Sequence, residues 1–244
     1  MSLRVAVLQH EPETGLGAFA ALLEEAHVDY EVVETLRGPL PDVDAFDGAI
    51  ALGGSLNAYD PRLLETRRWI RNGVLHGMPF FGVCLGGQLL ASALGAAVER
   101  QRRPELGVHD VYLTDAARRD PLFSGLPGRL AVFGWHEDRF NLPPGAVPLA
   151  GSIACSYQAF RFDAAAYGLQ FHPEVRPGDV ARWTRVPGYR TMLEAAGASP
   201  DHLAGELARA APDLDALTRD LLGRWLDLAS RVAPVARRQL RVAV

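Results

Sequence analysis

A cysteine lies at a predicted sharp turn in the segment "PFFGVCLGGQLLASALGA", residues 79–96. An apolar run with strand character ends at Cys84, and an apolar helical pattern follows directly. Glycines stand two residues before and two residues after this cysteine. The pattern Gly-x-Cys-x-Gly is the cysteine form of a nucleophile elbow, in which free N–H groups at a helix start favour a thiolate and can hold an oxyanion. The alternative is a buried structural cysteine, which is common for a free thiol.

A thiolate nucleophile needs a base, and the base needs a group that orients it. The segment "AYGLQFHPEV", residues 166–175, offers both, because a short β-like run leads to His172 and then to Glu174. Residues two apart in an extended chain point the same way, so the carboxylate can fix the tautomer of the imidazole and stabilise the imidazolium. Alone, such a His-Pro-Glu segment is often a solvated strand end. Together with the cysteine elbow it indicates a Cys-His-Glu triad.

Two further residues are weaker candidates for chemistry. Cys155 is interpreted as structural, because it has no glycine elbow or base near it in the sequence. His136 is either a pocket residue or an ordinary hydrogen-bonded loop histidine, and we favour the second interpretation.

Alternating strands and helices must position the triad. The sequence predicts strands at 3–9, 29–35, 46–54 and 79–83, and helices at 15–27, 61–77 and 84–94. This alternation predicts an α/β fold: a three-layer sandwich of flavodoxin type, with a mostly parallel sheet and helices on both faces. Sites in such sheets form at the carboxyl ends of the strands, where Gly54 and Cys84 both lie.

The second half of the chain changes character. Short β-like runs at 108–114, 129–135, 146–152, 157–163 and 166–172 predict an antiparallel extension of the same sheet. From residue 176 the pattern is helical, with an amphipathic stripe of Leu214, Leu217, Leu221, Trp225, Leu228 and Val232. We therefore predict one domain over 1–196 and a helical extension over 197–244 that packs on it. The less favoured alternative for the stripe is a helix that binds a partner.

Composition excludes several classes of function. The 244 residues carry a net charge of -4, so no basic field would attract nucleic acid. Two cysteines form neither a disulfide framework nor a zinc cluster, which favours a reducing, cytoplasmic location. No apolar run approaches the ~18 residues of a membrane span, and the N-terminus does not resemble a signal peptide. The chain contains no lysine, which excludes Schiff-base chemistry and a P-loop.

The segments "GVCLGGQLLASALGA" and "YGLQFHPEV" resemble those of the class I glutamine amidotransferases, the triad type with a cysteine nucleophile. The resemblance covers about residues 3 to 175 in the same order, and "ALGGS" is similar to the glycine turn after the third strand of that family. "WHEDRFNLPPGAVPLAGSIACSYQAFRF" resembles the stand-alone, GMP-synthetase-like branch. Departures are Ser55 where many members have proline, Glu137 where glycine is common, and Tyr157 where asparagine is frequent.

The resemblance implies both a site and a reaction. The implied site consists of Cys84 as nucleophile, His172 as base, Glu174 as orienting group, the backbone N–H groups of Gly54 and Leu85 as oxyanion hole, and Gln88 as the glutamine-binding residue. Tyr157 departs from the family pattern and is a further candidate for substrate binding, near the substrate mouth. The implied reaction is hydrolysis of the glutamine γ-amide through a cysteine thioester, which releases glutamate and ammonia. It requires neither a metal nor an organic cofactor.

The sequence shows no module that would use the ammonia, since a Ser-Gly-Gly-x-Asp phosphate loop is absent from it. Three hypotheses follow. The first is a glutamine amidotransferase or glutaminase, for which the candidate partner is a separate synthase subunit. The second is a stand-alone γ-glutamyl peptidase or hydrolase with the same triad. The third is a non-catalytic binding module, against which the intact triad argues. The first two differ on the leaving-group side of the pocket, where Tyr157 is a candidate wall.

Overall fold

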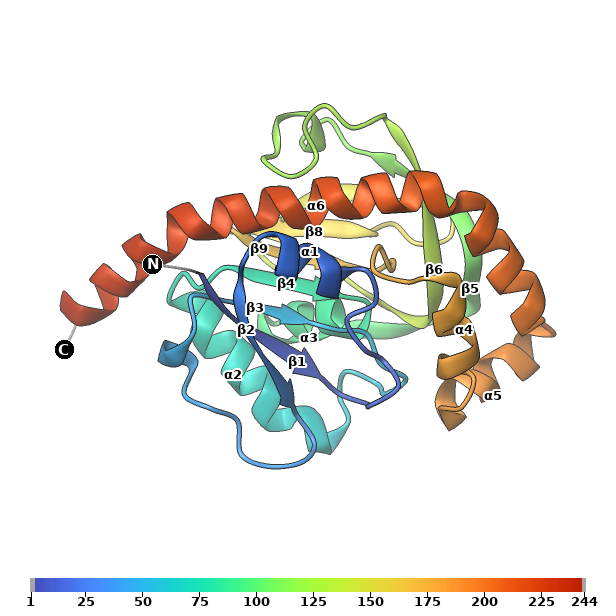
Figure 1. Ribbon diagram of the computed structural model, residues 1–244, viewed down its shortest axis with the longest axis horizontal. Coiled ribbons are helices and arrows are strands. Elements are labelled where there is room, and N and C mark those ends of the chain that lie inside the picture. The colour runs from blue at the N-terminus through green and yellow to red at the C-terminus, as the bar shows by residue number, and fades with distance from the viewer. Residues whose placement is uncertain (1–2, 243–244) are drawn as a thin grey trace.

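A nine-stranded mixed sheet forms the centre of the computed structural model, which describes residues 3–242 and side chains as far as Ala233 (Figure 1). The strands are β1 (Arg4–Gln9), β2 (Asp29–Glu34), β3 (Gly48–Ala51), β4 (Phe80–Val83), β5 (Val98–Leu113), β6 (Arg129–Phe140), β7 (Val147–Gly151), β8 (Ala159–Phe162) and β9 (Ala166–Leu169). Their order is β2-β1-β3-β4-β9-β8-β7-β5-β6, parallel as far as β9 and antiparallel beyond it. This confirms the predicted α/β fold with an antiparallel extension.

Helices cover both faces of the sheet. They are α1 (Phe19–Glu25), α2 (Leu64–Leu75), α3 (Leu85–Ala93), α4 (Pro177–Trp183), α5 (Pro187–Ala196) and α6 (Pro200–Val242), with short 3-10 turns η1 (Val43–Ala45), η2 (Pro61–Leu63) and η3 (Ala117–Arg119). Alternate residues of β1 point to opposite faces, so Val7 joins the cluster under α1 and α6, and Leu8 joins the cluster under α2 and α3. A third cluster forms beneath α4, α5 and the start of α6.

Helix α1 is shorter than the predicted 15–27, for a reason that concerns the triad. Gly17 has a φ of +52°, a conformation that favours glycine, and a Cβ there would collide with the carbonyl oxygen of Glu174. The next residue, Ala18, donates its N–H to that same oxygen at 2.7 Å. Gly17 and Ala18 therefore contact the His-Pro-Glu segment, and α1 begins only at Phe19.

Strands β5 and β6 are longer than the sequence predicts. The predicted strand at 108–114 is the last part of a 16-residue strand that starts at Val98, and the predicted strand at 129–135 continues to Phe140. Their pairing shifts register between Arg100 and Glu105, where one strand bulges. As a result, His136 lies on a strand rather than on a loop.

The long helix α6 packs on the sheet with the predicted stripe. Leu214, Leu217, Leu221 and Trp225 are buried, while Leu228 and Val232 are partly exposed. Figure 1 shows this helix bending before it crosses the sheet. Pro212 lies inside it, and an internal proline bends a helix because it lacks an N–H and displaces the preceding turn. The division of the chain into 1–196 and 197–244 stays a prediction.

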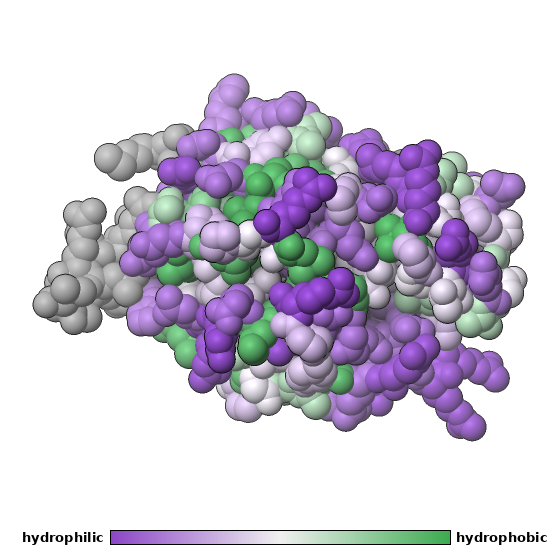
Figure 2. Space-filling view, turned by 90° about the horizontal axis from the view of Figure 1, so that it is seen from below, coloured by the Kyte–Doolittle hydropathy of each residue, from purple (hydrophilic) through white to green (hydrophobic). Residues whose placement is uncertain are grey.

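The surface is largely polar on the side shown in Figure 2, where hydrophilic residues separate the hydrophobic areas. Within residues 3–242, none of the helices combines the length and apolar character that crossing a bilayer requires.

Trp225 is the central contact between α6 and the sheet, and we expect its removal to destabilise the fold. The side chain is fully buried, its ring centroid lies 5.7 Å from that of Phe81, and its Nε1 donates to the carbonyl oxygen of Ala165 at 3.2 Å. Trp225→Ala should lower the free energy of unfolding by about 3–5 kcal/mol. Denaturant titration measures this, with Ile153→Ala, 97% exposed, as the control within about 0.5 kcal/mol of wild type. Equal effects would contradict the packing described.

Candidate active site

The backbone turns sharply at Cys84, between β4 and α3. Its φ of +50° and ψ of -107° lie outside the regions that a non-glycine residue prefers, and such strain costs about 1–3 kcal/mol. Two glycines permit the turn: a Cβ at Gly82 would be 2.5 Å from the carbonyl oxygen of Gly86, and one at Gly86 would collide with that of Ala51. The N–H of Cys84 donates to Leu169 of β9 at 2.8 Å. The predicted elbow geometry is therefore present.

His172 and Glu174 form a buried pair beside this cysteine. Nδ1 of His172 lies 2.8 Å from Oε1 of Glu174, and a Cβ placed on Gly53 would be 2.6 Å from Cε1 of His172 and 3.6 Å from Cβ of Cys84. The Nε2 atom is buried and makes no hydrogen bond within the described part of the chain. Burial alone lowers the pKa of His172, but the charges of Glu174 and of a Cys84 thiolate outweigh burial and raise it to about 10. The raised pKa favours the protonated form of the imidazole.

The two predicted oxyanion residues lie together at the start of α3. Leu85 is the first residue of that helix, so its N–H has no acceptor within the helix. A Cβ on Gly54 would be 2.8 Å from Cδ2 of Leu85, which shows how closely the glycine turn approaches. The turn is fixed by Glu11, which accepts from both the N–H and the hydroxyl of Ser55 at 2.6 Å. Ser55 therefore makes a side-chain hydrogen bond to Glu11 that a proline at this position could not make.

Two glutamine side chains line the other side of the cysteine. Gln88, one turn further along α3, is buried and donates to the carbonyl oxygen of Asp138 at 3.0 Å and to Oε1 of Gln170 at 3.4 Å. Gln170 in turn directs its Nε2 at Sγ of Cys84, 3.8 Å away. The structure thus brings Gln88 close to the nucleophile through a residue that the sequence analysis did not select.

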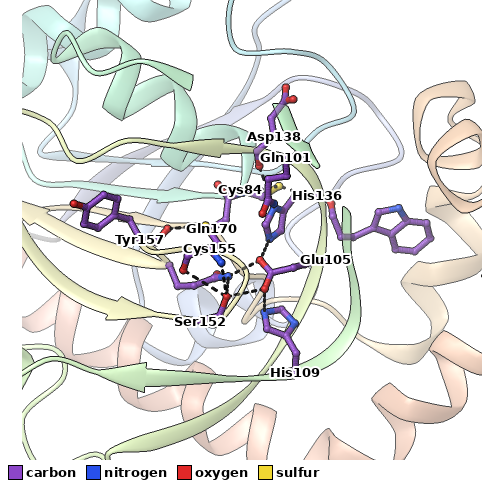
Figure 3. A network of polar contacts seen from close by, with 12 residues as sticks. Cys84, Gln101, Glu105, His109, His136, Asp138, Ser152, Cys155, Tyr157 and Gln170 are labelled. Carbon is purple, nitrogen blue, oxygen red and sulfur yellow. Dashed lines mark hydrogen bonds and ion pairs between the residues drawn. The ribbon is translucent and has the colours of Figure 1, made fainter. Parts of the chain in front are cut away.

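A polar network behind the cysteine is centred on Glu105 (Figure 3). Its carboxylate accepts from Ser152 Oγ and from Gln158 Nε2, both at 2.7 Å, and lies 3.2 Å from Nε2 of His136. Burial opposes the charge of Glu105, but the hydrogen bond and charge of His136 keep the pKa of its carboxyl below the usual value. His109 adds a fourth contact to the carboxylate of Glu105 at 3.7 Å, and burial lowers the pKa of that histidine.

This network holds one wall of the candidate site. His136 also contacts Gln101, with Nε2 of the amide 2.8 Å from Nδ1 of the ring. The carbonyl oxygen of Trp135, the residue before His136, lies 4.0 Å from Sγ of Cys84. The carbonyl oxygen of Asp138 accepts a hydrogen bond from Gln88. His136 is therefore a hydrogen-bonded histidine, as favoured, but its bonds fix the strand that faces the nucleophile.

The other residues singled out in the sequence lie further away. Figure 3 shows the ring of Tyr157 pointing away from Cys84, and the side chain packs at the edge of the cluster under α2 and α3. Its part in substrate binding stays a prediction. Cys155 is buried, burial raises its pKa to about 11, and its Sγ contacts the carbonyl oxygen of Tyr157 at 3.3 Å. Glu137 is partly exposed and pairs with Arg100 at 2.6 Å.

Three residues were missed by the sequence analysis: Glu11, Glu105 and Gln170. Gln170 carried a usable signal, because it stands two residues before His172 in the predicted β-like run 166–172, where such residues are expected on the same side. The two glutamates carried none, since their partners lie far away along the chain. Among the described residues, no group of three or more His, Cys, Asp or Glu side chains is arranged to hold a metal ion.

Comparisons with known proteins agree with the sequence resemblance. A family model described as glutamine amidotransferase class-I matches residues 18–182. The glutamine-hydrolysing GMP synthase of Thermomicrobium roseum is 40% identical over 159 residues, which are 64% of this chain and 29% of that protein. One of the subunits of the glutamine-hydrolysing GMP synthase of Thermoplasma acidophilum is 32% identical over 158 residues, 63% of this chain and 76% of that polypeptide.

A solved structure extends the likeness to almost the whole chain. The crystal structure of a glutamine amidotransferase from Thermotoga maritima superposes with a TM-score of 0.83 at 30% sequence identity. The match covers 93% of this chain and 99% of the other.

Replacing Glu174 tests the cause of the raised pKa of His172. A group whose pKa rises on folding adds stability below its unfolded pKa of 6.5, and that stability is lost as the pH rises through the folded value of about 10. Glu174→Gln removes the charge and keeps an oxygen acceptor for Nδ1. We expect the wild-type advantage in unfolding free energy over this variant to be largest near pH 6 and to shrink toward pH 10. Denaturant titrations at about pH 6, 8 and 10 measure it.

The exposed Glu24, changed to glutamine, is the matched control and should show no such trend. A gap between wild type and Glu174→Gln that stays constant over the whole pH range would contradict the charge-based explanation.

Proposed function

Because the chain belongs to the class I glutamine amidotransferase family, we propose that it hydrolyses the γ-amide of glutamine through a thioester on Cys84. One observation carries this proposal: a cysteine with a φ of +50° stands at a helix start beside His172, whose Nδ1 is 2.8 Å from Glu174. That arrangement joins a nucleophile, a base and an orienting carboxylate in one buried site. The chain spans 29% of the Thermomicrobium roseum synthase, so the activity of that whole protein is not carried over.

The first half of the reaction forms the thioester. The Cys84 thiolate attacks the γ-carbonyl carbon, and a carbon–sulfur bond forms as the carbonyl oxygen becomes an oxyanion. The N–H groups of Gly54 and Leu85 are the proposed donors to that oxyanion, because both lie at the elbow and that of Leu85 lacks a helical acceptor. His172 gives the proton on Nε2 to the amide nitrogen, the carbon–nitrogen bond breaks, and ammonia leaves.

The second half releases glutamate. Neutral His172 takes a proton from a water molecule, and the resulting hydroxide attacks the thioester carbon. The carbon–sulfur bond breaks and the thiolate of Cys84 is restored, while the proton taken from water stays on the imidazole for the next cycle. Glu174 holds the ring in one tautomer throughout, since its Oε1 is bound to Nδ1. Over the cycle, glutamine and water become glutamate and ammonia.

We also propose a destination for the ammonia and a location for the enzyme. The Thermoplasma acidophilum relative is named as one of the subunits of a GMP synthase, and by analogy a separate synthase subunit is the proposed acceptor partner here. Both cysteines are free in the structure, and a catalytic thiol must stay reduced, so we place the enzyme in the cytoplasm. No cofactor enters the proposed reaction.

The proposal is tested by the release of glutamate from glutamine. We expect turnover by wild type and a loss of at least about 1,000-fold in Cys84→Ala, since removing the nucleophile leaves only binding effects. Mass spectrometry of the mixture with a glutamine-like chloroketone should find one adduct, on Cys84. Cys155→Ala is the matched control and should keep both turnover and adduct, because its thiol bonds to the carbonyl oxygen of Tyr157 and has no part in the proposed triad.

A γ-glutamyl dipeptide, assayed in parallel, separates the alternatives. Turnover of the dipeptide with glutamine ignored would replace this proposal with γ-glutamyl hydrolysis. Failure of Cys84 to react with the chloroketone, in a folded protein, would favour the non-catalytic binding module.

A further inference from the structure

Helix α5 brings a tyrosine to the candidate site from beyond the segment that the family model matches. The first turn of this helix lies against the glycine turn, since a Cβ on Gly188 would be 2.7 Å from both Cβ and Oγ of Ser55. The next residue, Tyr189, is completely buried. Figure 1 shows α4 and α5 together at one end of the molecule, beside β5 and β6.

Two tryptophans hold the ring of Tyr189. It stacks on Trp183 with centroids 5.2 Å apart and planes 14° apart, and it meets Trp135 edge-on at 5.2 Å. Each tryptophan also adjoins a reacting group: the ring of Trp183 is 4.7 Å from that of His172, and the carbonyl oxygen of Trp135 is 4.0 Å from Sγ of Cys84. Tyr189 is therefore fixed on the flank of the nucleophile where His172 stands.

The hydroxyl of Tyr189 is buried and has no hydrogen-bond partner among the described residues. Burial first, and then the negative charges of Cys84, Glu11 and Glu174, raise its pKa well above the ordinary value. The group is therefore a neutral donor, held by two rings that themselves adjoin His172 and Cys84. A buried hydroxyl without a partner costs about 1–3 kcal/mol, so this one is expected to border a space that a polar group fills during the reaction.

The leaving group departs on this same flank. In the proposed reaction, His172 protonates the amide nitrogen, so that nitrogen and any substituent on it must lie on the imidazole side of Sγ. Glutamine places only an NH₂ group there. A γ-glutamyl peptide or alkylamide would place a carbon chain there, against the aromatic group formed by Trp135, Trp183 and Tyr189.

We propose that Tyr189 is a specificity residue that closes the leaving-group side of Cys84, so that the site accepts the primary amide of glutamine and rejects γ-glutamyl amides substituted on nitrogen. The inference rests on the proposed function and deepens it, because it selects glutamine over γ-glutamyl peptides as the substrate class. In this proposal Tyr189, and not Tyr157, limits the space on the leaving-group side, because the ring of Tyr157 points away from Cys84 (Figure 3).

Substrates of graded size test the wall. We expect wild type to hydrolyse glutamine and to leave γ-glutamyl ethylamide essentially untouched. Tyr189→Ala should raise the ratio of kcat/KM for the ethylamide to that for glutamine by about 10-fold or more, the scale on which a pocket discriminates one or two carbons. Tyr189→Phe keeps the ring, so it should keep the ratio while lowering kcat/KM for glutamine up to about 10-fold through the lost hydroxyl contact.

A second measurement needs no turnover and so separates this inference from the proposed function. Cys84 is alkylated with iodoacetamide and with its N-butyl derivative, and the two cysteines are quantified by mass spectrometry. We expect the butyl reagent to be disfavoured in wild type and to recover in Tyr189→Ala. Cys155 serves as an internal reference, because its thiol is fully buried and bonds to the carbonyl oxygen of Tyr157 instead of pairing with a base. Tyr112→Ala, on an exposed tyrosine of β5, is the matched control.

Each outcome decides one question. Equal labelling of wild-type Cys84 by both reagents, or an unchanged ratio in Tyr189→Ala while Cys155 stays protected, would overturn the role of Tyr189 even if glutamine is hydrolysed. Size-dependent labelling that Tyr189→Ala abolishes would support it even if glutamine is not hydrolysed, and in that case the proposed function alone would fail.

Discussion

The close packing of the backbone around Cys84 requires glycines, because a Cβ atom at those positions would collide with neighbouring strands. The positive φ of the cysteine is held because Gly86 lets α3 contact Ala51 of β3, and Gly87 lets the same helix contact Leu169 of β9. The turn after β4 is thus packed against both neighbouring strands, β3 and β9. Such strain persists only where the surrounding packing holds it, so the backbone conformation of Cys84 depends on the whole sheet and not on the local sequence alone.

Buried or partly buried carboxylates also stabilise the site, because each forms hydrogen bonds or ion pairs with parts of the chain that are distant in sequence. Glu11, after β1, fixes the turn at Ser55, and Glu105 of β5 ties together β6, β7 and the segment before β8. The His-Pro-Glu segment is tied by its backbone as well: Ala18 donates to Glu174, and Thr218 of α6 donates to Pro173. Both halves of the sheet and the long helix therefore share in holding one small site.

The parts of the site that could be predicted are those whose signal is local. Cys84 stands between glycines at a change of hydrophobic period, and His172 and Glu174 are two residues apart, so spacing alone indicates how they point. The start of β5 was missed because its first residues are polar and its pairing passes through a bulge. Tyr189 looks like an ordinary core residue of an amphipathic helix, and only its contacts with Trp135 and Trp183 reveal that it lies beside the triad.

The place of β9 in the sheet has a consequence for how the protein is made. This strand lies between β4 and β8, with Phe80 paired to Ala166, although β5 to β8 are all synthesised in between. A ribosome adds about 5–20 residues per second and delivers the N-terminal part first, so the nascent chain carries its cysteine elbow with an open strand edge until β9 arrives. The last strand to be translated is the one that brings His172 to the thiol. The proposed reaction therefore cannot begin on a chain that ends before His172, and a chain that stalls before β9 exposes an open strand edge that favours aggregation.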